Sequence, residues 1–243
     1  MRRDLNEYYK NEKRTLKRRY LDELYGFYDL IGIKRPLDPP KRTVAEEVAN
    51  AVSHGLGALF SLLALVFMLP RAKTQGALIG CAVYFFGLFI MFMSSCLYHA
   101  LGHGTRAKRV LRRLDYAGIY LLIGATFFPL LLSLFNSGTA AFLISVQWLL
   151  IAAAISLVAT FGPGKSQILH AGFCLLLGWS GVLLLPRIIA TSKAAALFII
   201  GGGALYTVGV IPCFMKRRGS HFIWHIFVLL GSFVEGLGVL EFL

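Results

Sequence analysis

Apolar residues gather into seven long runs, and polar residues are largely confined to the short segments between them. The runs cover roughly residues 46–69, 76–101, 114–135, 139–161, 168–186, 194–212 and 221–242. Each is close to the roughly 20 helical residues that cross the hydrocarbon core of a bilayer. Because unpaired backbone polar groups are costly in lipid, such runs predict transmembrane helices. The expected fold is an all-α bundle of seven transmembrane helices.

Glycine and proline positions agree with closely packed membrane helices. Glycines recur inside the second, sixth and seventh runs, where small residues let neighbouring helices approach each other. Pro129 falls inside the third run and is expected to kink it. Pro70, Pro186 and Pro212 are expected to mark the ends of runs.

The first 42 residues are different, because they are polar, basic and rich in tyrosine. Apolar and aromatic positions recur there at nearly helical spacing, which predicts an amphipathic helix on the membrane surface. Three prolines then end any helix before the first run. The chain therefore divides into a basic arm, residues 1–42, and a seven-helix domain, residues 43–243. We expect the arm to be a membrane anchor; a regulatory, partner-binding role is the alternative.

The composition supports a membrane protein. Of 243 residues, 57% are hydrophobic and 15% are charged, which is far from the balance of a soluble domain. The net charge of +13 could suit nucleic acid, but 12 of the 25 Lys and Arg residues fall in the first 42 positions. Most of the others lie in short loops, as juxtamembrane charge facing anionic lipid does. Membrane lipids are therefore the expected partners, and nucleic acid is not.

The distribution of basic residues predicts the orientation. With the N-terminus inside, the inside segments hold 21 Lys and Arg residues and the outside segments hold four, namely Arg71, Lys73, Arg187 and Lys193. The positive-inside rule therefore places the N-terminus in the cytoplasm. Because the number of spans is odd, the C-terminus is expected to be extracellular.

A pair of histidines opens the last apolar run. His221 and His225 are four residues apart, so on a helix both rings can reach a single point. Ionisable rings at the mouth of a membrane helix are tolerated mainly beside a partner, water or a metal. The pair is a candidate for half of a zinc site. Two rings hydrogen-bonded to water or lipid headgroups are the alternative.

The predicted topology brings more polar residues to the same end of the bundle. The second run ends there with Ser95 and His99, and the third begins there with Asp115. Three histidines from two helices, His99, His221 and His225, would form a catalytic zinc site with an open fourth position. Zn²⁺ is thus the predicted cofactor. Asp115 is the candidate general base for the zinc water, and Ser95 is a candidate hydrogen-bond donor to that water or to a substrate carbonyl.

Structural roles stand beside these assignments. Asp115 follows two arginines and could be a helix N-terminal acid that opposes the dipole. Ser95 could bond to a carbonyl one turn earlier. Cys96 could rival one histidine as a ligand, and His103 could pair with His99, although a solvated histidine at the helix end is favoured for His103.

Other polar residues of the runs complete the candidate site. Glu47, Asn50 and His54 start the first run on the same side and are expected around the ligands. For His170 a hydrogen-bonded structural role is expected. Glu235 lies about 15 Å beyond His225 on a helix, out of reach of the metal. Its burial there indicates a cavity that extends toward the other side of the membrane.

Four separated motifs lie in order along the first, second, third and seventh runs. They are Glu47-x-x-Asn50-x-x-Ser53-His54-x-x-Gly57, Ser95-x-x-x-His99, Leu114-Asp-Tyr-Ala-Gly-Ile119 and His221-x-x-x-His225-Ile-Phe-Val. Together they resemble the progestin and adiponectin receptor superfamily, in its bacterial hemolysin III branch. The resemblance covers about residues 45–243.

This resemblance implies a multi-pass protein of the plasma (inner) membrane, with zinc held at His99, His221 and His225 and with Asp115 and Ser95 near the zinc water. It also implies kinship with alkaline ceramidases, which release a fatty acid from ceramide. The leading hypothesis is a zinc-dependent intramembrane hydrolase of a lipid amide or ester that acts in membrane-lipid homeostasis. The alternatives are a pore-forming, cytolytic protein, which would need an oligomer, and a zinc-stabilised sensor without turnover.

Overall fold

The structure is a computed structural model that describes residues 11–12, 14–16, 39–163, 167–215 and 217–243. The chain forms two units, Met1–Leu37 and Asp38–Leu243. Most of the predicted amphipathic arm, residues 1–42, lies outside the described residues. The second unit contains the membrane domain.

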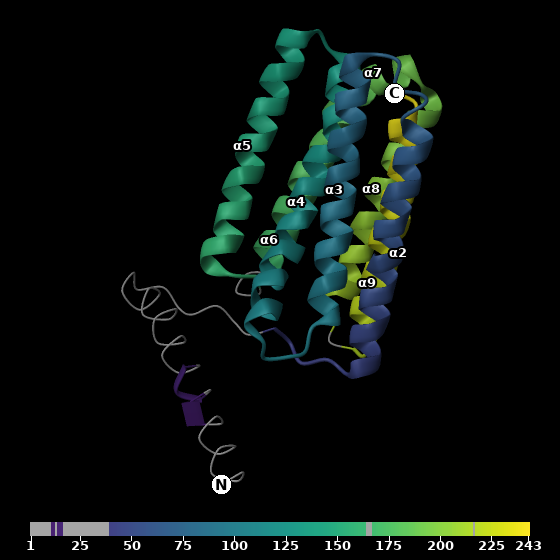
Figure 1. Ribbon diagram of the computed structural model, residues 1–243. Coiled ribbons are helices and arrows are strands. Elements are labelled where there is room, and N and C mark those ends of the chain that lie inside the picture. The colour runs from purple at the N-terminus through teal and green to yellow at the C-terminus, as the bar shows by residue number, and fades with distance from the viewer. Residues whose placement is uncertain (1–10, 13, 17–38, 164–166, 216) are drawn as a thin grey trace. The chain divides into compact units, whose positions relative to one another are not determined.

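Seven helical segments are long and apolar enough to cross a membrane (Figure 1). Six are single helices: α2 (Val44–Met68), α3 (Gln75–Ala100), α4 (Arg106–Leu134), α5 (Ser137–Phe161), α8 (Lys193–Phe214) and α9 (Ser220–Leu240). The seventh, Gln167–Thr191, combines α6 (Gln167–Trp179), the 3₁₀ helix η1 (Ser180–Leu184) and α7 (Leu185–Thr191). No strand occurs in the part of the chain that the structure describes. The predicted seven-helix membrane architecture is confirmed.

Two of the predicted boundaries change. The third span starts at Arg106 and not near residue 114, because Thr105 caps the helix by accepting a hydrogen bond from the Lys108 amide at 3.2 Å. The prediction that Pro186 ends the fifth span was wrong. Pro186 lies in the first turn of α7, where its missing N–H removes no helical hydrogen bond, and the span continues to Thr191.

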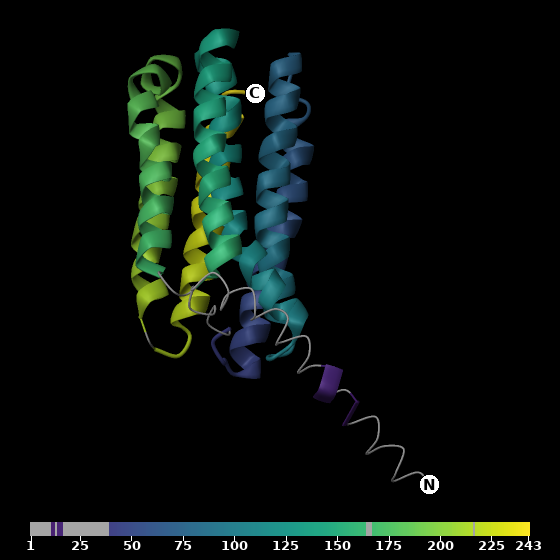
Figure 2. The same cartoon turned by 90° about the vertical axis from the view of Figure 1, so that its left-hand side faces the viewer.

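Small residues set the closest helix contacts. α3 packs between α2 and α4, while α9 packs against α8 and α2 (Figures 1 and 2). A Cβ atom placed on Gly87 of α3 would collide with Ala125 of α4, and one placed on Gly118 of α4 would lie 2.9 Å from the Cα of Met91. The packing role expected for the glycines of the second span is thereby confirmed at Gly87.

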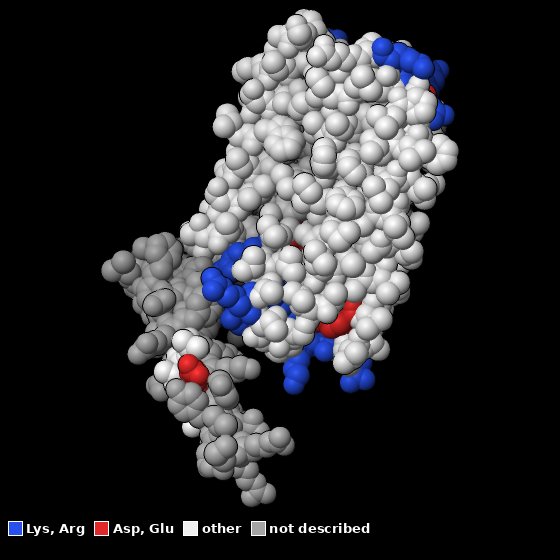
Figure 3. Space-filling model, in the orientation of Figure 1, with Lys and Arg blue, Asp and Glu red and all other residues white. Residues whose placement is uncertain are grey.

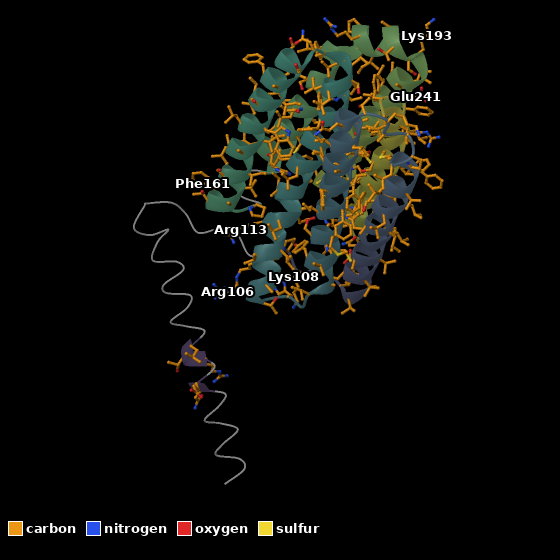
Figure 4. The ribbon with its side chains drawn as sticks, turned by 45° about the horizontal axis from the view of Figure 1, so that its top comes forward. Arg106, Lys108, Arg113, Phe161, Lys193 and Glu241 are labelled. Carbon is orange, nitrogen blue, oxygen red and sulfur yellow. The ribbon has the colours of Figure 1, made fainter. Side chains whose placement is uncertain are left out.

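Alternating spans place the start of α2, the end of α3 and the starts of α4 and α9 at one end of the bundle. We call this the basic end, because Arg106, Lys108 and Arg113 lie there, opposite Lys193 and Glu241 (Figure 4). Between the two ends the visible surface is largely uncharged (Figure 3), as expected for a surface that faces lipid. Assignment of the basic end to the cytoplasm stays a prediction.

Candidate metal centre

The three predicted ligands meet at the basic end. His99 lies in the last turn of α3, and His221 and His225 lie in the first two turns of α9. His221 Nε2 is 3.3 Å from His99 Nε2 and 3.2 Å from His225 Nε2. One nitrogen from each ring lies within 4.8 Å of the other two, and this trio is the candidate metal site among the described residues.

The separation of these nitrogens suits zinc. With Zn–N bonds of about 2.0–2.1 Å and tetrahedral angles, two nitrogen ligands are about 3.3 Å apart. The two Nε2 separations at His221, 3.3 and 3.2 Å, agree with this value. His99 and His225 are almost completely buried, so the rings are fixed by their surroundings.

Helix α2 binds the opposite ring nitrogens. His99 Nδ1 is 2.6 Å from Glu47 Oε2, and His225 Nδ1 is 3.3 Å from the carbonyl oxygen of Asn50. Ser53 Oγ is also 3.2 Å from His225 Nδ1. A carboxylate or carbonyl oxygen only accepts, so each Nδ1 donates its hydrogen. When these rings are neutral, the Nε2 atoms of His99 and His225 then carry lone pairs.

These lone pairs provide a test of metal binding that is independent of spacing. His221 Nε2 can donate at most one hydrogen, yet it faces the Nε2 atoms of both other rings. Without a cation, at least two acceptor nitrogens would therefore face each other in a buried site, which is unfavourable. A single cation accepts all three lone pairs. The residues present thus fit a metal ion.

A buried lysine holds Glu47 in place. Lys108 Nζ is 2.9 Å from Glu47 Oε1 and donates to the carbonyl oxygens of Tyr98 at 3.1 Å and Leu101 at 2.9 Å. The side chain of Lys108 is 0% exposed. The ion pair balances the Glu47 charge and aims the second carboxylate oxygen at His99. Lys108 was not among the predicted site residues, and nothing in the sequence distinguishes it from its basic neighbours.

Asp115 lies well past the first turn of α4, which begins at Arg106. The alternative that Asp115 is a helix N-terminal acid is therefore wrong. It lines a cavity together with His221 and His225. The cavity thus brings a carboxylate from α4 to the same space as two of the candidate ligands.

Ser95 lies in α3, one turn before His99. Its hydroxyl is completely buried and faces the Asp115 side chain, with which it interacts, and it does not bond to a carbonyl one turn earlier. The neighbouring Ser94 does make that bond, to the Met91 carbonyl at 3.1 Å. The structure thus brings the two candidate catalytic residues, Ser95 and Asp115, together.

All three residues expected around the ligands contact a ligand ring. Besides the contacts of Glu47 and Asn50, His54 stacks on His225 with ring centroids 3.7 Å apart and an interplanar angle of 19°. Phe92 meets the His54 ring edge-on at 5.2 Å. Neither nitrogen of His54 has a hydrogen-bond partner in the described chain. His54 thus supports the His225 ring by packing.

The remaining candidates lie outside the cluster. Cys96 does not belong to the group of close ligands, and His103 is exposed in the turn after α3. His170 Nδ1 is 2.9 Å from the Tyr120 hydroxyl, which is the hydrogen bond expected of it, and His170 also lines the cavity that contains Asp115.

A cavity of about 170 Å³ extends from the histidines between α4, α6, α8 and α9. This is roughly ten times the space that one buried water needs. Its walls are mostly apolar and include Leu122, Phe127, Leu130, Leu175, Val182 and Val228. Asp115, His221 and His225 form its polar end, and Glu235 also lines it, as expected.

Over residues 42–235 the chain matches the family model described as Haemolysin-III related. It is 33% identical over 195 residues to the Hemolysin-3 homolog of Bacillus subtilis (strain 168), covering 78% of this chain and 91% of the relative. It is 30% identical over 195 residues to Hemolysin-3 of Bacillus cereus, covering 78% and 88%. The adiponectin receptor protein of Drosophila melanogaster is 26% identical over 228 residues, covering 82% of this chain and 51% of that protein.

Proposed function

This chain belongs to the Haemolysin-III related family, in the hemolysin III branch of the progestin and adiponectin receptor superfamily, and on that premise we propose that it is a zinc-dependent hydrolase of membrane lipids. It would cleave an amide or ester bond and so adjust the lipid composition of the membrane. One observation carries the proposal. The Nε2 atoms of three histidines converge, and two of these histidines, His221 and His225, line the polar end of an apolar cavity.

The three histidines would hold the metal through their Nε2 atoms, with Glu47 and Asn50 fixing the orientation of two rings. The chemistry that zinc supplies in such a site is a bound water with a pKa near 7 and polarisation of an acyl carbonyl. The open coordination position needed for this chemistry follows from a set of three protein ligands.

The other residues of the site have separate roles in the proposed reaction. Asp115 accepts a proton from the attacking water and returns it to the leaving amine or alcohol, so that one water is consumed and a fatty acid is released. The buried Ser95 hydroxyl donates a hydrogen bond to the oxygen of the scissile carbonyl. The apolar walls of the cavity bind the acyl chain.

Metal analysis and lipid hydrolysis of purified protein test the proposal together. The native protein should carry one zinc per chain and hydrolyse a member of a panel of fluorescent ceramides, acyl esters and phospholipids. Replacing both His221 and His225 by Ala should remove zinc and turnover. Asp115→Asn should keep zinc and slow turnover by about 10²–10⁴-fold, the usual contribution of a general base.

His103→Ala is the matched control, because His103 is exposed outside the cluster. It should keep the native zinc content and rate. A purified protein without zinc, or one that retains zinc after loss of both histidines, would contradict the proposed metal site. Native turnover in Asp115→Asn would contradict the proposed base.

The name of one relative, Hemolysin-3 of Bacillus cereus, favours cytolysis as a second candidate function. Dye release from vesicles separates the two candidates. A lytic protein would release dye equally well as the native chain and as Asp115→Asn. A zinc-stabilised sensor would bind metal but would neither release dye nor hydrolyse lipid.

A further inference from the structure

Glu235 is a carboxyl group that the proposed reaction does not use, although it lines the same cavity. It lies ten residues beyond His225 on α9, about 15 Å farther along the helix at roughly 1.5 Å per residue. Val228, between them in sequence, also faces the cavity. A carboxyl group is therefore placed deep in the apolar part of the cavity, far from the histidines.

Nothing in the described chain pairs with this carboxyl group. Glu235 makes no hydrogen bond or ion pair with the residues that the structure describes, and no Lys or Arg lines the cavity. The tyrosine hydroxyls beside this part of α9 are already engaged with Ser232. Tyr206 pairs with its hydroxyl at 2.8 Å, and Tyr84 donates to its carbonyl at 3.4 Å.

Helix α8 fixes the position of the Glu235 side chain. A Cβ atom on Gly202 would overlap the Glu235 side chain and would lie 3.0 Å from the Gly231 carbonyl oxygen. The absence of a side chain at Gly202 thus leaves room for Glu235 between α8 and α9. The carboxyl group is held at the cavity wall with its hydrogen-bonding capacity unused.

An unpaired carboxyl group in an apolar wall is unfavourable, and ionisable groups inside membrane helices usually have a partner or face water. A charged carboxyl group only accepts hydrogen bonds, whereas a neutral one both donates and accepts. A hydroxyl group, which can also donate and accept, can pair with either form. An ammonium group would lose much hydration on entering this cavity. A hydroxyl group loses far less.

We propose that Glu235 forms a second polar subsite that binds a hydroxyl group on the hydrocarbon chain of the bound lipid. The inference rests on the proposed function in placing the acyl carbonyl at the histidines, which brings the middle of an extended chain to Glu235. Lipids with a mid-chain hydroxyl would then bind in preference to unsubstituted ones. A site built to bond a hydroxyl discriminates against the analogue that lacks it.

Tryptophan quenching measures this preference without any turnover. Trp179 and Trp224 line the cavity, whereas Trp148 does not. A nitroxide-labelled stearic acid should quench the cavity tryptophans, and unlabelled acids should displace it. Stearic acid hydroxylated at mid-chain should displace the probe at about tenfold lower concentration than stearic acid, as one hydrogen bond to a buried acceptor allows.

Two substitutions decide the role of the carboxyl group. Glu235→Leu should abolish the preference for the hydroxylated acid while plain stearic acid still displaces the probe, which also reports that the cavity is intact. Glu235→Gln keeps an acceptor oxygen in nearly the same shape and should keep most of the preference. Glu241→Gln is the matched control, since Glu241 bonds to Ser192 at 2.9 Å outside the cavity lining.

Equal displacement by the two acids in the native protein, or a preference that survives in Glu235→Leu, would overturn the inference. Displacement by neither acid would overturn it as well. Because the assay needs no catalysis, its outcome is separate from that of the hydrolysis test. Lipid hydrolysis without a preference for the hydroxylated acid would contradict only the proposed Glu235 subsite. A preference for the hydroxylated acid without lipid hydrolysis would contradict only the proposed hydrolase activity.

Discussion

At the scale of single residues, the contact between Glu47 and Lys108 connects three helices through one ion pair. Glu47 of α2 uses one carboxylate oxygen for His99 of α3 and the other for Lys108 of α4. Lys108 in turn closes the end of α3 by donating to the carbonyl oxygens of Tyr98 and Leu101. The orientation of a candidate metal ligand therefore depends on a lysine that does not touch it.

Loss of either partner should weaken metal binding. Residues that orient metal-binding histidines typically contribute 10–100-fold to metal affinity. We expect the zinc affinity of Glu47→Gln and of Lys108→Met to fall by about this factor, measured by competition with a chelator. Arg106→Met, an exposed residue at the same end of the bundle, should retain the native affinity.

Thermal unfolding tests whether Glu47 and Lys108 form a buried ion pair, separately from the effect of these residues on metal binding. Removing one partner leaves a buried charge without its counter-ion, which usually costs about 3–5 kcal/mol, whereas removing both costs less. The double variant Glu47→Gln, Lys108→Met should therefore unfold at a higher temperature than Glu47→Gln alone, while its zinc affinity stays low. Equal unfolding temperatures would contradict a buried ion pair.

At the scale of elements, hydrophobic periodicity and span length were enough to predict the seven spans, because every crossing must meet the same length and polarity requirements. The start of α4 was less predictable. Charged residues after Thr105 read as a loop, yet in the structure they continue the helix beyond its apolar part. Pro186 was misassigned for a related reason, since proline both ends helices and begins them.

The candidate site was predictable to the extent that it follows from topology. Alternation of spans places His99 and the two histidines of α9 at one end, whatever the details of packing. Lys108 could not be identified in the same way, since it is one of several basic residues before the third apolar run. Lys108 is buried against Glu47, to which it is ion-paired. The two residues lie far apart in the sequence, so hydrophobic periodicity gives no sign of this contact.

We predict that the conformation of the turn before α9 positions the two histidines of that helix. Gly219 adopts φ 75°, a left-handed conformation, and its amide donates to Glu46 Oε1 at 3.0 Å, which ties the start of α9 to α2. An L-residue there costs about 1–2 kcal/mol. Gly219→Ala should lower both the unfolding temperature in detergent and the zinc affinity, because the histidines follow directly.

Gly102 provides the matched control for this substitution. It lies in a turn at the same end, has open space around the position of a Cβ atom and does not have a positive φ. Gly102→Ala should leave both measurements unchanged. Native zinc affinity in Gly219→Ala would mean that the conformation of this turn does not position the histidines.

At the scale of the whole molecule, the orientation of the bundle decides which compartment would supply zinc and water to the proposed metal site. The candidate ligands lie at the end where α3 finishes and α9 begins. The inside segments of the predicted topology hold 21 Lys and Arg residues against four outside. This asymmetry predicts that the metal centre opens toward the cytoplasm.

Thiol labelling in intact cells tests that orientation on the full chain. Lys73→Cys, in the turn between α2 and α3, should react with a membrane-impermeant maleimide applied to intact cells. Gly102→Cys, in the exposed turn between α3 and α4, should react only after the membrane is permeabilised. The parent chain, with its four cysteines in the spans, gives the background. The opposite labelling pattern would place the metal centre outside the cell, and zinc and water would then have to reach the histidines from the extracellular side.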